Sequence, residues 1–259
     1  MNIIFFFENF SRISLIFYSI SRFLFIKIFR GTLYEKEADG FKLIKKNNNL
    51  NIIDIGANDG LSSSFFLSNF KNSKIYIYEP LKNSLINIKN DNNNKIKIFN
   101  VALGDENNSK FLNIPYYNLF GTSIRIYLSA YSIINNNNNN KKIYDLNPSL
   151  RTFFFYKKIL NKRIKVKMEK LDNYNLKPNI IKLDIEGYED RAINGGKNLI
   201  KKYKPIMYIE RPTSKLINFL KKTGYKMYVY DLSNKKFTSI KKTSSEYRNY
   251  YFLANRKYL

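Results

Sequence analysis

The 259-residue chain contains no cysteine and no histidine. These absences exclude disulfide bonds, thiolate catalysis, a Ser-His-Asp triad, and zinc or iron sites with imidazole ligands. Proton transfer would have to use Asp, Glu, Lys or Tyr side chains. A metal could bind only through oxygen ligands, which favours Mg²⁺ or Ca²⁺, and no motif in the chain predicts such a site.

Acidic residues are few, because 20 Asp and Glu stand against 45 Lys and Arg, for a formal net charge of +25. Such a charge is typical of proteins that bind nucleic acid or anionic lipid. However, lysine is abundant together with Asn, Ile, Phe and Tyr, which all have A/T-rich codons, and the lysines are scattered rather than clustered. We therefore attribute most of the charge to genome composition and do not expect a nucleic-acid partner.

Long uncharged apolar runs are missing as well. Residues 3–29 are strongly apolar, but their longest charge-free stretch, Ile13–Ser21, is too short to span a membrane, and no signal-peptide cleavage site follows. The apolar spacing predicts an amphipathic helix within an N-terminal extension, residues 1–46. This helix either packs on the main domain or lies in the plane of an anionic membrane. We expect a cytoplasmic protein, in which residues 1–30 would contact the inner face of the membrane in the second case.

From residue 50 onward, short apolar runs alternate with helical patterns. This alternation predicts an α/β fold with a doubly wound, mostly parallel sheet, whose functional loops lie at the carboxyl ends of the strands. The predicted strands are residues 50–55, 74–78, 95–101, 179–183, 205–209, 226–230 and 250–254, and the predicted helices are residues 61–70, 81–89, 189–201 and 214–222. A polar segment separates the last two strands, which predicts an antiparallel pair at one edge of the sheet. Residues 131–163 contain an Asn homopolymer and are expected to form an insertion with a solvated loop.

The stretch "NIIDIGANDGLSS" places a glycine-rich turn, Asp54–Gly60, between a predicted strand and a predicted helix. Glycine in such a turn lets a ligand approach backbone N–H groups and the helix N-terminus. A P-loop would need Lys followed by Ser or Thr after the second glycine, and the G-x-x-x-G spacing departs from the dinucleotide fingerprint G-x-G-x-x-G. S-adenosylmethionine, which has no pyrophosphate, is the third ligand class. A tight turn with a solvated carboxylate is the alternative without a ligand.

Acidic residues also follow the predicted strands. Asp54 could accept a hydrogen bond from a ligand ammonium group, and Glu79, which closes the strand in "IYIYEP", is placed to bind two ribose hydroxyls. In "IKLDIEGYED", Asp184 and Glu186 lie at the carboxyl end of a central strand and point to the same face. One of them could orient a substrate hydroxyl and take its proton. The alternative for Glu186 is capping of the helix that follows.

The segments "IIDIGANDG", "YIYEP", "NVALGD" and "IIKLDIEGYEDRAINGGKNLIKKYKPIMYIE" resemble, in order and spacing, the FkbM family of S-adenosylmethionine-dependent methyltransferases. The resemblance runs from about Asn51 to Glu210 and includes "VKMEKLDNY". It implies a seven-stranded, Rossmann-like class I methyltransferase fold with a reversed edge strand over residues 47–259. It also implies methyl transfer from S-adenosylmethionine to a hydroxyl of a sugar, glycan or natural product.

The resemblance further implies a role for each matching residue. The amino-acid half of the cofactor would be held by Asp54, Gly56, Ala57, Asn58 and Gly60. Glu79 would hold the ribose, and the adenine would lie along Asn100, Ala102 and Leu103. Asp184 and Glu186 would face the methyl group and the acceptor, and Ser123 in "GTSI" would lie near the site. The low-complexity middle and the apolar N-terminus depart from the family core, so they leave the acceptor and the oligomeric state open.

Two other functions remain as alternatives. The net charge favours a 2′-O RNA methyltransferase, but such enzymes commonly use a Lys-Asp-Lys-Glu tetrad, and the strand end after Pro205 offers Glu210 and Arg211 where that tetrad would have a lysine. The amphipathic start and the Asn-rich middle are also compatible with a non-catalytic, membrane-associated scaffold that retains the fold. A dehydrogenase is disfavoured by the glycine spacing.

Overall fold

The computed structural model describes residues 35–44, 49–82, 84–85, 88, 94–119, 122–125 and 160–254. The expected N-terminal helix, most of the Asn-rich insertion and the Ser123 side chain lie outside the described residues. The chain divides into two compact units, one of residues 1–28 with 110–165 and one of residues 29–109 with 166–259. The second unit carries the main sheet and the candidate site.

The main sheet of the second unit has eight strands in the order β11-β10-β12-β9-β8-β1-β2-β3. Strands β3, β2, β1, β8 and β9 pair in parallel, β12 is antiparallel to both β9 and β10, and β11 is antiparallel to β10. The strand bounds are β1 (Asn51–Ile55), β2 (Lys74–Tyr78), β3 (Ile96–Phe99), β8 (Ile180–Leu183), β9 (Ile206–Glu210), β10 (Lys226–Asp231), β11 (Lys236–Ser239) and β12 (Asn249–Leu253).

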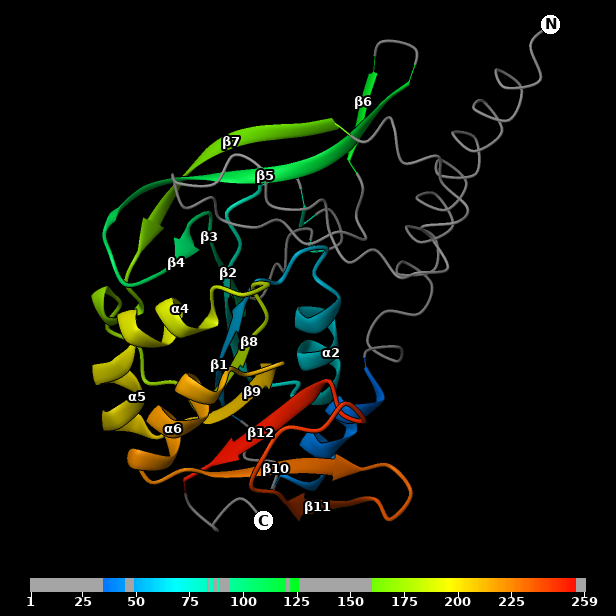
Figure 1. Cartoon of the computed structure of the whole chain (residues 1–259), viewed down its shortest axis with the longest axis vertical. Coiled ribbons are helices and arrows are strands. Elements are labelled where there is room, and N and C mark those ends of the chain that lie inside the picture. The colour runs from blue at the N-terminus through cyan, green and yellow to red at the C-terminus, as the bar shows by residue number, and fades with distance from the viewer. Residues whose placement is uncertain are drawn as a thin grey trace, which may run out of the picture. The chain divides into compact units, whose positions relative to one another are not determined.

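Helices cover both faces of this sheet, as Figure 1 shows. On one face lie α4 (Glu189–Gly195), α5 (Lys197–Tyr203) and α6 (Ser214–Lys222), and on the other lie α2 (Leu61–Asn69) and the 3-10 helix η1 (Lys36–Leu43). Successive residues of a strand point to opposite faces. Along β1, Ile53 and Ile55 therefore pack in the core of α4 to α6, whereas Ile52 packs in the core of α2 and η1.

The helix η1 belongs to the core of the second unit, although the sequence assigned its residues to the N-terminal extension. Phe41 is 1% exposed. Its ring lies 5.1–6.4 Å, between ring centroids, from the rings of Phe65, Phe66, Phe70, Tyr208 and Tyr251. Aromatic packing of this kind adds stability beyond the apolar area buried. Residues 35–44 are thus fixed over the sheet.

A second, four-stranded sheet has the order β4-β7-β5-β6. Its strands are β4 (Ala102–Leu103), β5 (Asn108–Leu119), β6 (Thr122–Arg125) and β7 (Leu160–Glu169). Sequence periodicity did not predict β5, β6 or β7, and β7 overlaps the end of the expected insertion, residues 131–163. The short 3-10 helix η3 (Leu171–Asn173) follows β7 directly.

The mostly parallel α/β fold is confirmed, but its details differ from the sequence prediction. The sheet has eight strands rather than seven, because the Lys-rich segment between the last two predicted strands contains β11. The reversed strand β12 is inserted between β9 and β10 instead of lying at the edge. The helix predicted over residues 189–201 is divided at Gly196 into α4 and α5. The described residues of the helix predicted over 81–89 form turns.

None of the described helices combines the length and the apolar character that crossing a bilayer requires.

Candidate active site

The glycine turn after β1 is shaped by the chain's own atoms. Gly56 and Gly60 have φ of +76° and +85°, which favour glycine. A Cβ at Gly56 would lie 2.0 Å from the carbonyl oxygen of Asp184, and one at Gly60 would lie 2.5 Å from Cγ1 of Ile88. Both glycines are therefore required by close packing with neighbouring segments, whether or not a ligand approaches the turn.

Asp54 lies in the interior of the protein. Its side chain is fully buried, and its Oδ2 accepts hydrogen bonds from the hydroxyls of Ser62 (2.6 Å) and Ser63 (2.5 Å) in the first turn of α2. Among the described residues, Oδ1 has no hydrogen-bond partner, and its nearest cation is Nζ of Lys182, 3.7 Å away. This carboxylate joins the start of α2 to strand β8.

Lys182 is the central cation of the site. It is 4% exposed, and its Nζ donates to the carbonyl oxygen of Gly56 (3.1 Å) and lies 3.2 Å from Oδ2 of Asp184. Burial alone would lower the pKa of an amine, but the carboxylates of Asp184 and Asp54 outweigh it and raise the pKa of Lys182. Lys182 therefore stays charged and ties the glycine turn to the carboxyl end of β8.

Three carboxyl groups meet at the carboxyl ends of β8 and β9, and we call Asp184, Glu186 and Glu210 the carboxyl cluster. One carboxyl oxygen from each residue lies within 4.8 Å of one oxygen of each of the other two. The Asp184 side chain is 29% exposed, whereas Glu210 is 6% exposed. Burial would raise the pKa of Asp184, but Lys182 and a hydrogen bond with Glu210 lower it below its usual range. Burial and the hydrogen bond to Asp184 raise the pKa of Glu210 to about 8.

Residues far apart in the sequence hold this cluster from the side of β12. Nε of Arg248 lies 2.5 Å from Oε1 of Glu210. The carboxylate of Glu37 accepts hydrogen bonds from the backbone N–H groups of Arg248 and Asn249, and the Asn249 amide also donates to Glu35 (2.7 Å). Burial and the nearby Asp184 carboxylate raise the pKa of Glu35. The segment before and within η1 thus completes one wall of the site.

The loop after β8 has a backbone that is unusual for its residues. Glu186 has φ of +54°, and Gly187 has φ of +89° with no atom within 4 Å of the position that a Cβ would take. Left-handed conformations at non-glycine residues cost roughly 1–3 kcal/mol and cluster at functional sites. Glu186 does not cap the following helix, because the start of α4 has no side-chain cap; Glu189 in its first turn instead accepts a hydrogen bond from the N–H of Ile185 (3.1 Å) in the preceding loop. Glu186 itself is exposed.

The other predicted cofactor residues fall into two groups. Glu79, fully buried at the end of β2, accepts from the backbone N–H groups of Asn58 and Leu81, both at 3.0 Å. The Asn100 amide donates to the carbonyl oxygen of Glu79 (3.3 Å). Together with Asp54, Gly56, Ala57 and Gly60, these residues form one continuous region at the carboxyl ends of β1, β2 and β3. By contrast, Ala102 and Leu103 pair with β7 in β4 and are buried, so they do not join this region.

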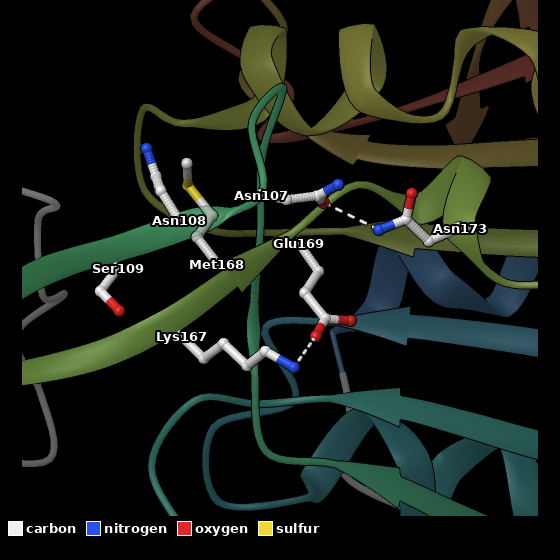
Figure 2. A pocket seen from close by; sticks show the side chains of 7 residues that line it. All are labelled: Asn107, Asn108, Ser109, Lys167, Met168, Glu169 and Asn173. Atoms are coloured by element: carbon white, nitrogen blue, oxygen red, sulfur yellow. Dashed lines mark hydrogen bonds and ion pairs between the residues drawn. The ribbon is translucent and has the colours of Figure 1, made fainter.

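A polar cavity of about 490 Å³ lies at the start of β5 and the end of β7. Figure 2 shows its lining residues, which are Asn107, Asn108, Ser109, Lys167, Met168, Glu169 and Asn173. Glu169 is paired with Lys167 and accepts a hydrogen bond from the hydroxyl of Tyr174. The Tyr174 ring packs edge-on against the stacked rings of Tyr78 and Phe99, at centroid distances of 5.0 and 4.8 Å.

This aromatic group connects the cavity to the candidate cofactor region, because Tyr78 and Phe99 directly precede Glu79 and Asn100 in the sequence. Amide, hydroxyl and carboxylate groups line the cavity, so it offers both donors and acceptors of hydrogen bonds.

A metal could in principle use the carboxyl cluster, because hard divalent cations bind several carboxylate oxygens at once. Here two of the three carboxyl groups already have partners within the chain. Lys182 lies against Asp184, and Arg248 lies against Glu210, which also retains its proton up to mildly alkaline pH. We therefore assign no metal to the carboxyl cluster.

Sequence reasoning found Asp184 and Glu186 but missed several of their partners. A signal for Lys182 was present, since a lysine within the buried run "IIKL" requires a paired carboxylate. Glu210 also ends a buried strand, where sites form in such sheets. No local pattern could have placed Glu35, Glu37 or Arg248 beside the site, because their contacts join segments about 210 residues apart.

Comparison with known families decides the relationship. Residues 54–227, more than half of the chain, match the family model of the methyltransferase FkbM domain. The chain belongs to the FkbM methyltransferase family. No curated protein matches it.

Two solved structures are similar to this family member. Methyltransferase FkbM from Methylobacillus flagellatus KT is 15% identical, with a TM-score of 0.46 over 79% of this chain, and this chain spans 44% of that protein's length. Precorrin-6y C5,15-methyltransferase from Geobacter metallireducens GS-15 is 13% identical, with a TM-score of 0.39 over 84% of each chain.

Proposed function

We propose that this FkbM family member is an S-adenosylmethionine-dependent O-methyltransferase that acts on a hydroxyl of a sugar, glycan or natural product. The observation that carries the proposal is the position of Asp184. It is a partly exposed carboxylate at the carboxyl end of a central parallel strand, held by Lys182 on one side and Glu210 on the other. Such strand ends are where ligands bind in open α/β sheets.

The charged side chains at the carboxyl ends of β8 and β9 suit a cationic ligand. Carboxyl groups predominate there, since Glu35 and the carboxyl cluster stand against Lys182 and Arg248. S-adenosylmethionine carries an ammonium and a sulfonium charge, and when bound it supplies an electrophilic methyl group. A dinucleotide pyrophosphate or an RNA backbone would instead meet repulsion from these carboxylates. The local charge therefore favours the methyl donor over both of those ligands.

The contacts at the carboxyl ends of the strands indicate which residues would hold the methyl donor. Glu79 would bind the ribose by exchanging one of its backbone partners, Asn58 or Leu81, for hydroxyl donors. Asp54 is enclosed by Ser62, Ser63 and Lys182, so we propose that it acts through Lys182, by fixing the glycine turn beneath the amino-acid half of the donor.

The chemical role of this chain's residues would be positioning and proton transfer. Asp184 would orient the acceptor hydroxyl and take its proton as the oxygen becomes methylated. Alignment of the reacting groups can lower a barrier by roughly 7–11 kcal/mol, and general-base assistance adds roughly 10²–10⁴-fold. Because Lys182 and Glu210 lower the pKa of Asp184, the carboxylate is ionised and ready to accept a proton at neutral pH.

The polar cavity at Asn107–Ser109 supports a hydroxyl-rich acceptor, since its groups both donate and accept hydrogen bonds.

Calorimetric titration with S-adenosylmethionine, with NAD as the control, tests the donor. Micromolar binding of the first ligand alone supports the proposal. If the folded protein binds neither ligand, the proposal fails and the non-catalytic scaffold becomes the better interpretation. A salt-dependent gel shift with tRNA fragments distinguishes the proposed function from that of a 2′-O RNA methyltransferase, which would bind the fragments.

A further inference from the structure

Glu210 lies beside Asp184 because of strand register. Strands β8 and β9 are parallel, and Leu183 is paired with Ile209. Asp184, the residue after β8, therefore lies beside Glu210, the last residue of β9, and one oxygen of each carboxyl group lies within 4.8 Å of the other. Asp184 is the more exposed of the two, while Glu210 is 6% exposed. Glu210 thus lies behind the carboxylate that would meet the acceptor.

Charged groups from every neighbouring element face this pair. Lys182 of β8 lies against Asp184, and Arg248, which precedes β12, lies 2.5 Å from Oε1 of Glu210. Nε of Arg211 is 4.0 Å from the same oxygen but is largely solvated. The remaining acidic neighbours are Glu186 in the loop after β8, and Glu35 and Glu37 at η1.

Two buried carboxylates in contact repel each other, so such a pair holds one proton over a wide pH range. Lys182 favours ionisation of Asp184, and burial disfavours ionisation of Glu210. The shared proton therefore lies on Glu210, which donates the hydrogen bond to Asp184. Oε1 of Glu210 also accepts a hydrogen bond from Nε of Arg248, which limits the orientations of the Glu210 carboxyl group.

We propose that Glu210 is a positioning residue for Asp184, and that its protonated carboxyl group holds the Asp184 carboxylate toward the acceptor hydroxyl. This inference rests on the O-methyltransferase function proposed above. In turnover, the new carbon–oxygen bond would form as the methyl–sulfur bond of the donor breaks and leaves a neutral thioether. The hydroxyl proton passes to Asp184, which then releases it to solvent through its exposed edge. Glu210 keeps its own proton throughout. Once Glu210 ionises, its hydrogen bond to Asp184 is lost and Asp184 is no longer held.

The test compares pH profiles of turnover in the full chain. Wild-type turnover should fall above about pH 8, where Glu210 ionises. Glu210→Gln retains an N–H donor toward Asp184 and an acceptor toward Arg248, so it should keep turnover near pH 7 within a few-fold and lose the fall at high pH. Glu210→Leu removes the hydrogen bond and should lower turnover about tenfold at pH 7, with the KM for S-adenosylmethionine unchanged.

Asp231→Asn is the matched control, because Asp231 is a hydrogen-bonded carboxylate at the end of β10, outside both the carboxyl cluster and the polar cavity. It should keep the wild-type pH profile. A fall at high pH that persists in Glu210→Gln would overturn the inference, and so would a raised KM with unchanged turnover in Glu210→Leu.

A second measurement does not need the acceptor. The infrared spectrum of the wild-type protein near pH 7 should contain a protonated carboxyl band that is absent from Glu210→Gln and disappears from the wild type above about pH 8. If the band is present but S-adenosylmethionine does not bind, the proposed function fails while the shared proton stands. If the donor binds but the band is absent, the positioning role fails by itself.

Discussion

Replacement of Lys182 by Met tests whether the buried cation holds the site together. The side chain is 4% exposed, and its Nζ contacts Asp184, Asp54 and the carbonyl oxygen of Gly56. Methionine fills a similar volume but removes the charge. Asp54 would then be a fully buried carboxylate whose Oδ1 has neither a hydrogen bond among the described residues nor a nearby cation.

Breaking a buried ion pair by removing one partner costs roughly 3–5 kcal/mol. The lost hydrogen bond to Gly56 adds about 1 kcal/mol. Because a domain is stabilised by only about 5–15 kcal/mol in total, the variant should lose a large part of its free energy of unfolding. In a chain of this size each kcal/mol corresponds to roughly 2–4 °C in Tm, so the expected decrease is on the order of 10 °C.

Urea unfolding followed by circular dichroism measures this loss. Lys236→Met on the exposed strand β11 is the matched control and should change stability by less than about 0.5 kcal/mol. The double variant Asp54→Asn/Lys182→Met should be more stable than Lys182→Met alone, because it removes the unpaired buried charge, while Asp184 is exposed enough to be hydrated. A Lys182→Met protein within about 1 kcal/mol of the wild type would refute the assignment of Lys182 as the compensating cation.

Further predictions address the chemistry, the turn and the N-terminus. Asp184→Asn should lower turnover by roughly 10²–10⁴-fold with donor affinity nearly unchanged, and unchanged turnover in steady-state assays would remove Asp184 from the role of base. Gly56→Ala should destabilise the fold by more than about 2 kcal/mol, because the new Cβ would lie 2.0 Å from the Asp184 carbonyl oxygen and the positive φ would be strained as well. Gly187→Ala has a similar φ but open space around the new Cβ, so it should destabilise the fold less in the same urea assay. We also propose that residues 1–30 bind anionic membranes, so the full chain should sediment with anionic liposomes more than a chain starting at Gly31, and equal sedimentation would dismiss this contact.

The sequence predicted the parallel part of the sheet because its strands are continuous apolar runs. Such runs occur where a strand is buried on both faces, and those at β1, β8 and β9 are almost entirely buried. The strand β11 was missed because its pattern, "KFTS", is exposed and polar at the sheet edge. An exposed edge strand does not need alternating apolar residues, so the hydrophobic periodicity of the sequence does not indicate it.

The candidate site was predicted only where one segment carries the chemistry. Asp184 and Glu186 follow from the position of "KLDIEG" at the end of a strand. The contacts of Glu37 with Arg248 and Asn249 depend on where η1 docks on the sheet. Docking is set by the packing of Phe41 among side chains from three other segments, which no local pattern encodes.

The burial of Asp54 shows a second limit of sequence reasoning. A carboxylate near the end of a buried strand predicts a ligand contact when the loop that follows is treated alone. In the folded chain, the Asp54 carboxylate accepts hydrogen bonds from Ser62 and Ser63 of α2. It also lies near the ammonium group of Lys182 in β8. The residue type was informative about the location of the site, but its partners decide whether it binds a ligand or supports one.

The net charge of the chain is positive, whereas carboxyl groups gather at the candidate site, and the reason is where each kind of residue lies. Lysines of β10 and β11, such as Lys226 and Lys236, are exposed to solvent, where charges are screened within about 10 Å at moderate salt. The carboxyl cluster and Glu35 instead meet at a partly buried strand edge, where electrostatic interactions are screened less. The overall +25 therefore does not determine the ligand. Raising the ionic strength should weaken any nonspecific RNA binding strongly, whereas binding of S-adenosylmethionine at the strand edge should change little.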